Sequence, residues 1–293
     1  MNENVNNNKN INWYPGHMEK AKKEVINSLK LVDLVIELLD ARIPYSSANP
    51  LVDDIVKNKP RIKLLNKADM ADKEITKLWI EEYKNKGIYA LDIDSISKYN
   101  LKKIDEVSKL ALAELIKKRE AKGIKANSIR ALIIGIPNVG KSTLINSLSS
   151  KKKAKVGNKP GVTKVLSWLN ITDFLQILDT PGILWPKFED QMVAYKLALT
   201  GAIKDDILDI EDLAYKGISF MKELYPNRIC EKYKLDDLDK ENYVILEDIA
   251  KNMNLLLKGG KPDTLRAAKL FLNDLRNQKL GAISYEKPKN WSI

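Results

Sequence analysis

Gly135-Ile-Pro-Asn-Val-Gly-Lys-Ser142 is the stretch that decides the fold of this 293-residue chain. It matches the pattern G-x-x-x-x-G-K-[S/T], in which successive main-chain N–H groups cradle phosphates. The apolar run Arg130–Ile134 before it is typical of a buried strand, and Thr143–Leu148 after it is typical of a helix. Because strand, tight loop and helix N-terminus together form an anion site, the sequence predicts an α/β nucleotide-binding fold.

Two side chains of this loop have expected tasks. Lys141 is expected to reach the β- and γ-phosphates, which makes it a catalytic candidate, and the Ser142 hydroxyl is expected to bind Mg²⁺. The residues expected to contact nucleotide through this loop are Asn138, Val139, Gly140, Lys141, Ser142 and Thr143.

A second motif, Asn66-Lys-Ala-Asp69, ends the apolar run Arg61–Leu65. An aspartate at this place accepts hydrogen bonds from the N1–H and the 2-amino group of guanine, whereas adenine would leave the carboxylate unpaired. The stem of Lys67 is expected to cover the base, and Asn66 to tie the loop to the phosphate loop. The motif favours GTP, although an ATP-using enzyme remains an alternative that Asp69 argues against.

Three shorter pieces complete a GTP site. Ser95 follows the predicted strand Ile88–Ile93, where GTP-binding proteins carry a short loop against the guanine carbonyl. Thr163 stands where a second protein ligand to Mg²⁺ is expected. Asp179-Thr-Pro-Gly182 matches D-x-x-G, so Asp179 is expected to hold Mg²⁺ through water and the Gly182 N–H to touch the γ-phosphate.

The order of these elements along the chain is rotated. GTP-binding proteins usually begin with the phosphate loop, yet here the guanine motif (66–69) and the serine loop (94–96) precede it at 135–142. An α/β domain tolerates this order, because the ligand lies at the carboxyl ends of several strands whatever their sequence order. The chain is therefore expected to carry a cyclically permuted domain over 13–202, after a disordered polar tail over 1–12.

The composition bounds the remaining possibilities. Lys and Arg number 50 against 39 Asp and Glu, a net charge of +11 that favours a polyanionic partner, with a lysine-rich proteome as the alternative reading. No apolar run approaches the ~18 residues of a membrane span. The single cysteine, Cys230, excludes an internal disulfide and fits a reducing cytosol.

The region 203–293 is expected to be a small all-helical domain, with helices over Ile210–Leu224, Asn242–Leu257 and Thr264–Gln278. The last helix carries cations close to one face. This face is either merely solvated or binds RNA phosphates. The candidate RNA-binding residues are Arg266, Lys269, Arg276 and Lys279.

Taken together, these motifs resemble the circularly permuted GTPases, and most closely the family of ribosome biogenesis GTPase A. The resemblance rests on Trp13–Met18, Asp40–Pro44, Asn66–Asp69, Gly135–Asn146, Pro160–Thr163 and Asp179–Lys187. It implies a mostly parallel sheet in a P-loop GTPase domain, followed by a small all-α domain. It also implies a cytoplasmic bacterial factor that binds rRNA and proteins of the large ribosomal subunit late in assembly and hydrolyses GTP there. We expect the protein to be a monomer.

The water-positioning step lacks its usual residue. The position after D-x-x-G, often a glutamine that orients the attacking water, is Ile183. Asn138 is similar to the asparagine that coordinates K⁺ in potassium-dependent GTPases, and His17 is the family's suspected substitute for the glutamine, although a lone histidine can also be a packing residue. Because of Ile183, a GTP-regulated RNA-binding scaffold with incidental turnover stays open as an alternative.

Overall fold

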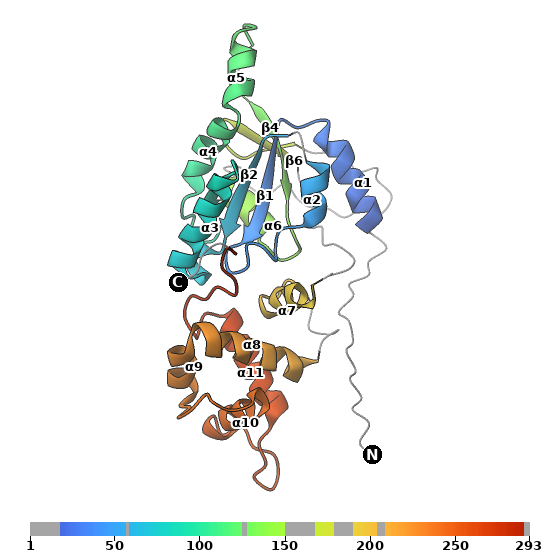
Figure 1. Ribbon diagram of the computed structural model, residues 1–293. Helices are drawn as coiled ribbons and strands as arrows, with labels where there is room; N and C mark the ends of the chain where they lie inside the picture. The colour runs from blue at the N-terminus through green and yellow to red at the C-terminus, as the bar shows by residue number, and fades with distance from the viewer. Residues whose placement is uncertain are drawn as a thin grey trace. The chain divides into compact units, whose positions relative to one another are not determined.

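The computed structural model describes residues 18–56, 59–124, 128–149, 168–178, 190–203 and 209–289. These residues form two compact units (Figure 1). One unit carries the sheet and contains the described residues of 18–178 together with 281–289; the other is helical and contains those of 190–280.

The sheet has six strands in the order β3-β2-β1-β4-β6-β5. All neighbouring pairs are parallel except β5 with β6, so the expectation of a mostly parallel sheet is confirmed. The bounds are β1 Leu34–Asp40, β2 Arg61–Asn66, β3 Tyr89–Asp92, β4 Ile129–Ile134, β5 Trp168–Asn170 and β6 Leu175–Leu178. Because β1, β2 and β4 run the same way side by side, the loops that follow them leave the sheet at one edge.

Helices of the sheet unit cover the strands, and hydrophobic side chains seal the contact. Val35 of β1 and Leu132 of β4 pack with residues of the helices over 18–29 and 50–55. Leu39 and Leu65 pack with residues of the helix over 73–85. Each such fully buried side chain contributes about 1.5–3 kcal/mol. The bounds are α1 Met18–Leu29, α2 Pro50–Ile55, α3 Lys73–Asn85, α4 Ile104–Ala111, α5 Ala113–Glu120 and α6 Lys141–Leu148, with short 3₁₀ turns η1 Ala68–Met70 and η2 Leu101–Lys103.

The helical unit packs its helices around Phe271 and Tyr233, both fully buried. Gly217 lets the helix over 210–224 approach the helix over 264–276 closely, because a Cβ there would lie 2.8 Å from the Phe271 ring. The bounds are α7 Gln191–Leu199, α8 Ile210–Leu224, α9 Pro226–Tyr233, α10 Asn242–Asn252 and α11 Thr264–Arg276. Among the described residues, no helix has the length and hydropathy needed to cross a bilayer.

The end of the chain differs from the expected domain boundary. The sequence grouped 203–293 as one helical domain, but residues 281–289 belong to the sheet unit. In Figure 1 this dark-red segment lies beside α3, and the indole N–H of Trp79 in α3 donates to the main-chain oxygen of Glu286 at 3.1 Å. The physical reason is burial, since Ile283 and Tyr285 are 2% and 3% exposed there.

Candidate nucleotide-binding site

Asn66, the last residue of β2, joins three loops of the site. Its side-chain N–H donates to the main-chain oxygen of Val139 at 2.8 Å, which links the guanine motif to the phosphate loop. Its side-chain oxygen accepts from the N–H and hydroxyl of Ser95 at 3.1 and 2.7 Å. The Ser147 hydroxyl of α6 in turn donates to the main-chain oxygen of Ser95 at 2.6 Å. These bonds join the loops predicted to bind the base and the phosphates.

Lys67 follows in the left-handed conformation, with φ 60°. Its ammonium donates to the main-chain oxygen of Asn138 at 2.9 Å and lies 3.0 Å from a carboxylate oxygen of Asp40. The stem of Lys67 is thus fixed at both ends. A base that stacks on this stem meets a surface already in place, which lowers the entropy cost of binding.

Asp40, at the end of β1, is a residue whose role the sequence did not reveal. It is buried, and Arg42 donates to its carboxylate from the guanidinium at 2.9 and 2.7 Å and from the main-chain N–H at 3.1 Å. Burial opposes the charge on Asp40, but Arg42 and Lys67 outweigh it and hold the pKa of that carboxyl well below its usual range. The signal was present in the motif Asp40–Pro44, which places an acid and a base at the carboxyl end of a buried strand.

The phosphate loop has the backbone of an anion cradle. Asn138 and Gly140 have positive φ values of 58° and 102°, which turn successive N–H groups inward at the start of α6. A Cβ at Gly135 would meet the Leu38 oxygen at 2.6 Å, so only glycine fits there. The Lys141 ammonium donates to the oxygens of Gly135 and Ile136 at 2.9 and 3.0 Å. The loop therefore fits a phosphate chain.

Asp69, the expected reader of guanine, lies exposed in η1. Partial desolvation and the nearby charge of Asp94 raise the pKa of its carboxyl. For Asp94 itself, hydrogen bonds from Ser97 and the Ile96 N–H overcome desolvation and lower the pKa. Asp94 is thus held ionised while it makes Asp69 easier to protonate, which matters because only the carboxylate can accept both guanine donors.

The expected Mg²⁺ ligands are only partly covered by the described residues. Ser142 and Thr143 are exposed in the first turn of α6, beside the phosphate cradle, so the Ser142 hydroxyl fits a cation bound to phosphate. In the described part of the chain, no group of three or more His, Cys, Asp or Glu side chains could hold a metal ion by itself. The remaining predicted site residues, Thr163, Asp179, Gly182, Ile183 and His17, lie outside the described residues.

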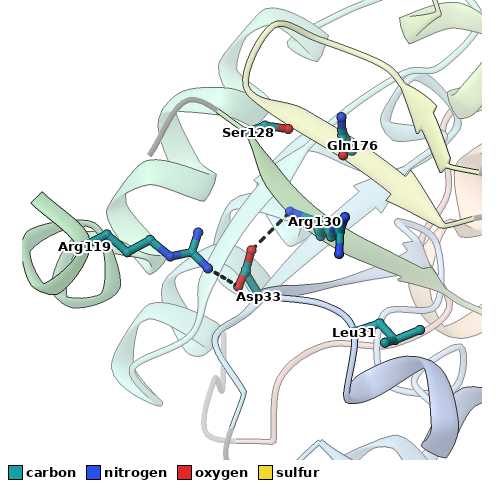
Figure 2. Close-up of a pocket in the computed structure, with 6 residues that line it drawn as sticks. All are labelled: Leu31, Asp33, Arg119, Ser128, Arg130 and Gln176. Carbon is teal, nitrogen blue, oxygen red and sulfur yellow. Dashed lines mark hydrogen bonds and ion pairs between the residues drawn. The ribbon is translucent and has the colours of Figure 1, made fainter. Parts of the chain in front are cut away.

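A separate cavity of about 400 Å³ lies near the start of the strands, away from the nucleotide loops. Asp33 stands just before β1, where it accepts from the Arg119 guanidinium at 2.6 Å and from the Arg130 N–H at 3.3 Å (Figure 2). The residues that line the cavity are Leu31, Asp33, Arg119, Ser128, Arg130 and Gln176. The Asp33 carboxylate in this lining already accepts from two arginine residues, and we assign this cavity no nucleotide.

The four predicted RNA-binding residues of the helical unit fall into two pairs. Arg266 and Lys269 of α11 are exposed. Arg276 instead donates from its guanidinium to the oxygens of Ala198 and Leu199 at 2.8 and 3.3 Å. The Lys279 ammonium lies 3.1 Å from the carboxylate of Asp274.

The comparisons with known proteins agree with this site. A family model described as "50S ribosome-binding GTPase" matches residues 130–257. Ribosome biogenesis GTPase A of Bacillus licheniformis is 49% identical over 96% of this chain and 99% of its own length. Its namesake in Thermotoga maritima is 36% identical over 96% of this chain and 95% of its own.

Solved structures agree as well. A crystal structure titled GNP-bound YlqF from T. maritima is 30% identical, covers 93% of this chain and all of its own, and has a TM-score of 0.62. A GDP-bound YlqF structure has a TM-score of 0.64 at 29% identity and covers 91% of this chain and all of its own. The expectation of GTP hydrolysis, rather than an ATP-using enzyme, is thus confirmed. The chain belongs to the ribosome biogenesis GTPase A family and is a circularly permuted P-loop GTPase of ribosome biogenesis.

Proposed function

We propose that this GTPase binds the large ribosomal subunit late in its assembly and is released when GTP is hydrolysed. The observation that carries the proposal is the chain order: D-x-x-G at 179–182 directly precedes the region that forms the helical unit. A change that follows loss of the γ-phosphate therefore acts on the chain that leads into that unit. We further propose that the protein works as a monomer in the cytoplasm, where large subunits assemble.

The proposed contact with rRNA lies on the helical unit. Lys258 and Lys261 are exposed on either side of a tight turn made by Gly259 and Gly260, both with positive φ. Arg266 and Lys269 of the following helix are exposed as well. Such cations contact phosphates and read shape rather than sequence, so binding should weaken steeply with salt. Arg276 and Lys279 bind other groups of the helical unit, so we leave them out of this proposed surface. Proteins of the large ribosomal subunit would border the surface.

The residues of the phosphate loop are proposed to hold GTP in place for hydrolysis. Lys141 would transfer its hydrogen bonds from the loop oxygens to the β- and γ-phosphates, and Asp69 would select guanine. Ser142, with Thr163 and Asp179, would hold Mg²⁺, which when bound neutralises phosphate charge.

Two groups are proposed to replace the missing glutamine at Ile183. Asn138 would present its side-chain oxygen to K⁺, which neutralises developing charge as an arginine finger does. His17 would orient the attacking water. In support of Asn138, its main chain is already fixed by Lys67 in a left-handed conformation that asparagine tolerates well. Equal hydrolysis rates in K⁺ and Na⁺ would remove the case for Asn138.

The decisive experiment measures GTP hydrolysis in K⁺, with and without purified large subunits. We expect subunits to raise the turnover number, and His17→Ala to abolish that rise while GDP affinity stays level. Ile183 favours a second candidate, a GTP-regulated RNA-binding scaffold whose turnover is incidental. Binding to subunits without any stimulation would favour the scaffold, and absence of binding would contradict both. As a check on base recognition, Asp69→Asn should shift preference from GTP toward xanthosine triphosphate.

A further inference from the structure

The last described residues of the chain run between the loop after β1 and the loop after β2, which carries the guanine motif. The Ile283 N–H donates to the oxygen of Met70, just after Asp69, at 2.9 Å. Two residues further, the Tyr285 N–H donates to the oxygen of Arg42 at 2.9 Å. The segment Ile283–Glu286 therefore bridges the loop after β1 and the loop after β2. No motif of the GTP site includes it.

Glu286 of this segment binds the loop after β1 through its carboxylate. One carboxylate oxygen accepts from the N–H groups of Tyr45 and Ser46, the latter at 2.9 Å, and the other accepts from the Ser46 hydroxyl at 2.6 Å. The side chain is 8% exposed. Hydrogen bonds to an ionised acceptor are about twice as strong as neutral ones, so Glu286 fixes the position of the loop that holds Ser46.

That loop in turn fixes Asp40. The Ser47 hydroxyl accepts from the Asp40 N–H at 3.0 Å and donates to the Ile43 oxygen at 2.7 Å, so the loop closes back on the end of β1. Asp40 then pairs with Lys67 at 3.0 Å. A continuous path of hydrogen bonds and short main-chain links thus runs from Glu286 to the lysine expected to cover the base.

We propose that Glu286 is a positioning residue for guanine nucleotide: by holding the loop 41–49, it sets the place of Lys67 and slows nucleotide release. The proposal rests on the function proposed above, because it concerns the same GTP site. It also gives the helical unit a second connection to that site, since Leu280 ends that unit and Gly281 begins the returning segment.

The test measures release of a fluorescent GDP analogue and steady-state GTP hydrolysis in full-length variants. Glu286→Gln replaces an acceptor oxygen with an amide that faces donors. We expect release to accelerate and the KM for GTP to rise by about tenfold, as for loss of one charged hydrogen bond, with kcat at saturating GTP unchanged. Trp79→Phe removes the indole N–H that donates to the Glu286 main-chain oxygen, together with part of a buried ring, and should produce a smaller change in the same direction.

Glu120→Gln is the matched control, because it makes the same charge change at an exposed site on α5. It should leave release and KM at wild-type values. A purely structural role for Glu286 would lower the melting temperature without changing release from the folded protein, and that outcome overturns the proposal. If wild-type protein prefers GTP and Asp69→Asn shifts that preference toward xanthosine triphosphate, while Glu286→Gln and Trp79→Phe release GDP normally, only this inference fails.

Discussion

The ammonium of Lys67 donates to the main-chain oxygen of Asn138 at 2.9 Å, joining residues 71 positions apart. One belongs to the motif predicted to read guanine and the other to the loop predicted to cradle phosphate. The pairing of β1 with both β2 and β4 brings the two loops to the same edge of the sheet. The Lys67 side chain thus links the two predicted recognition loops, and the Asp40 carboxylate lies 3.0 Å from its ammonium.

Replacing Asp40 by alanine should therefore damage both stability and binding. Removal of one partner leaves the buried Arg42 without its counter-charge, which costs about 3–5 kcal/mol. We expect a lower melting temperature and weaker GDP affinity, measured by thermal unfolding and by fluorescence titration. Glu106→Ala, at an exposed position of α4, serves as control and should change neither quantity.

The ion pair of Asp40 with Arg42 also predicts that the stability of the fold depends on pH. Because the pKa of Asp40 is depressed in the folded protein below its ordinary 3.8, its contribution to stability is present above that value and is lost as the pH falls below it. Acid unfolding monitored by circular dichroism should therefore be less steep in Asp40→Asn than in wild type. An unchanged acid transition would contradict the ion pair as a source of stability.

The sequence predicted the central strands well, because continuous apolar runs such as that of β4 have few other interpretations. It did not predict α9, since Pro226 resembles a helix breaker although proline is well suited to the first helical position. The charged stretch 99–121 has the pattern of one continuous helix and does not reveal its break: Leu112, 1% exposed, has φ −103° and separates α4 from α5. Long-range partners leave no local signal, so Glu286, 240 residues from Ser46, could not be found.

Guanine affinity should fall in acid at a higher pH than an ordinary aspartate would give. Only ionised Asp69 accepts both guanine donors, so affinity is retained above its pKa and lost as pH falls through it. Desolvation and Asp94 raise that pKa. Asp94→Asn should move the loss of GDP affinity to lower pH in a fluorescence titration, whereas the exposed Glu81→Gln in α3 should leave the profile in place.

Gly140→Ala should weaken GTP binding by about tenfold or more. A Cβ there would collide with the Asn66 amide, break its 2.8 Å bond to Val139 and force φ 102° on a residue with a side chain. Gly87→Ala separates the two effects, because Gly87 has φ 71° but nothing within 4 Å of an added Cβ. That control should lose about 1–2 kcal/mol of stability and keep its nucleotide affinity.

The two pairs of cations in the helical unit should give opposite phenotypes. Removing Arg276 leaves two carbonyls at the end of α7 without a charged donor, so Arg276→Ala should cost about 1–3 kcal/mol of stability. Arg266→Ala with Lys269→Ala removes two exposed charges. That double variant should melt as wild type does but bind rRNA less tightly, with a salt slope smaller by about 1.5–2.

Thermal unfolding and RNA titrations at several salt concentrations distinguish these cases. If Arg276→Ala lowered the salt slope without destabilising the helical unit, its guanidinium would be bound to phosphate rather than to α7. If the double variant kept the wild-type slope, the exposed face of α11 would be solvated only, and the proposed RNA surface would have to lie elsewhere on the chain.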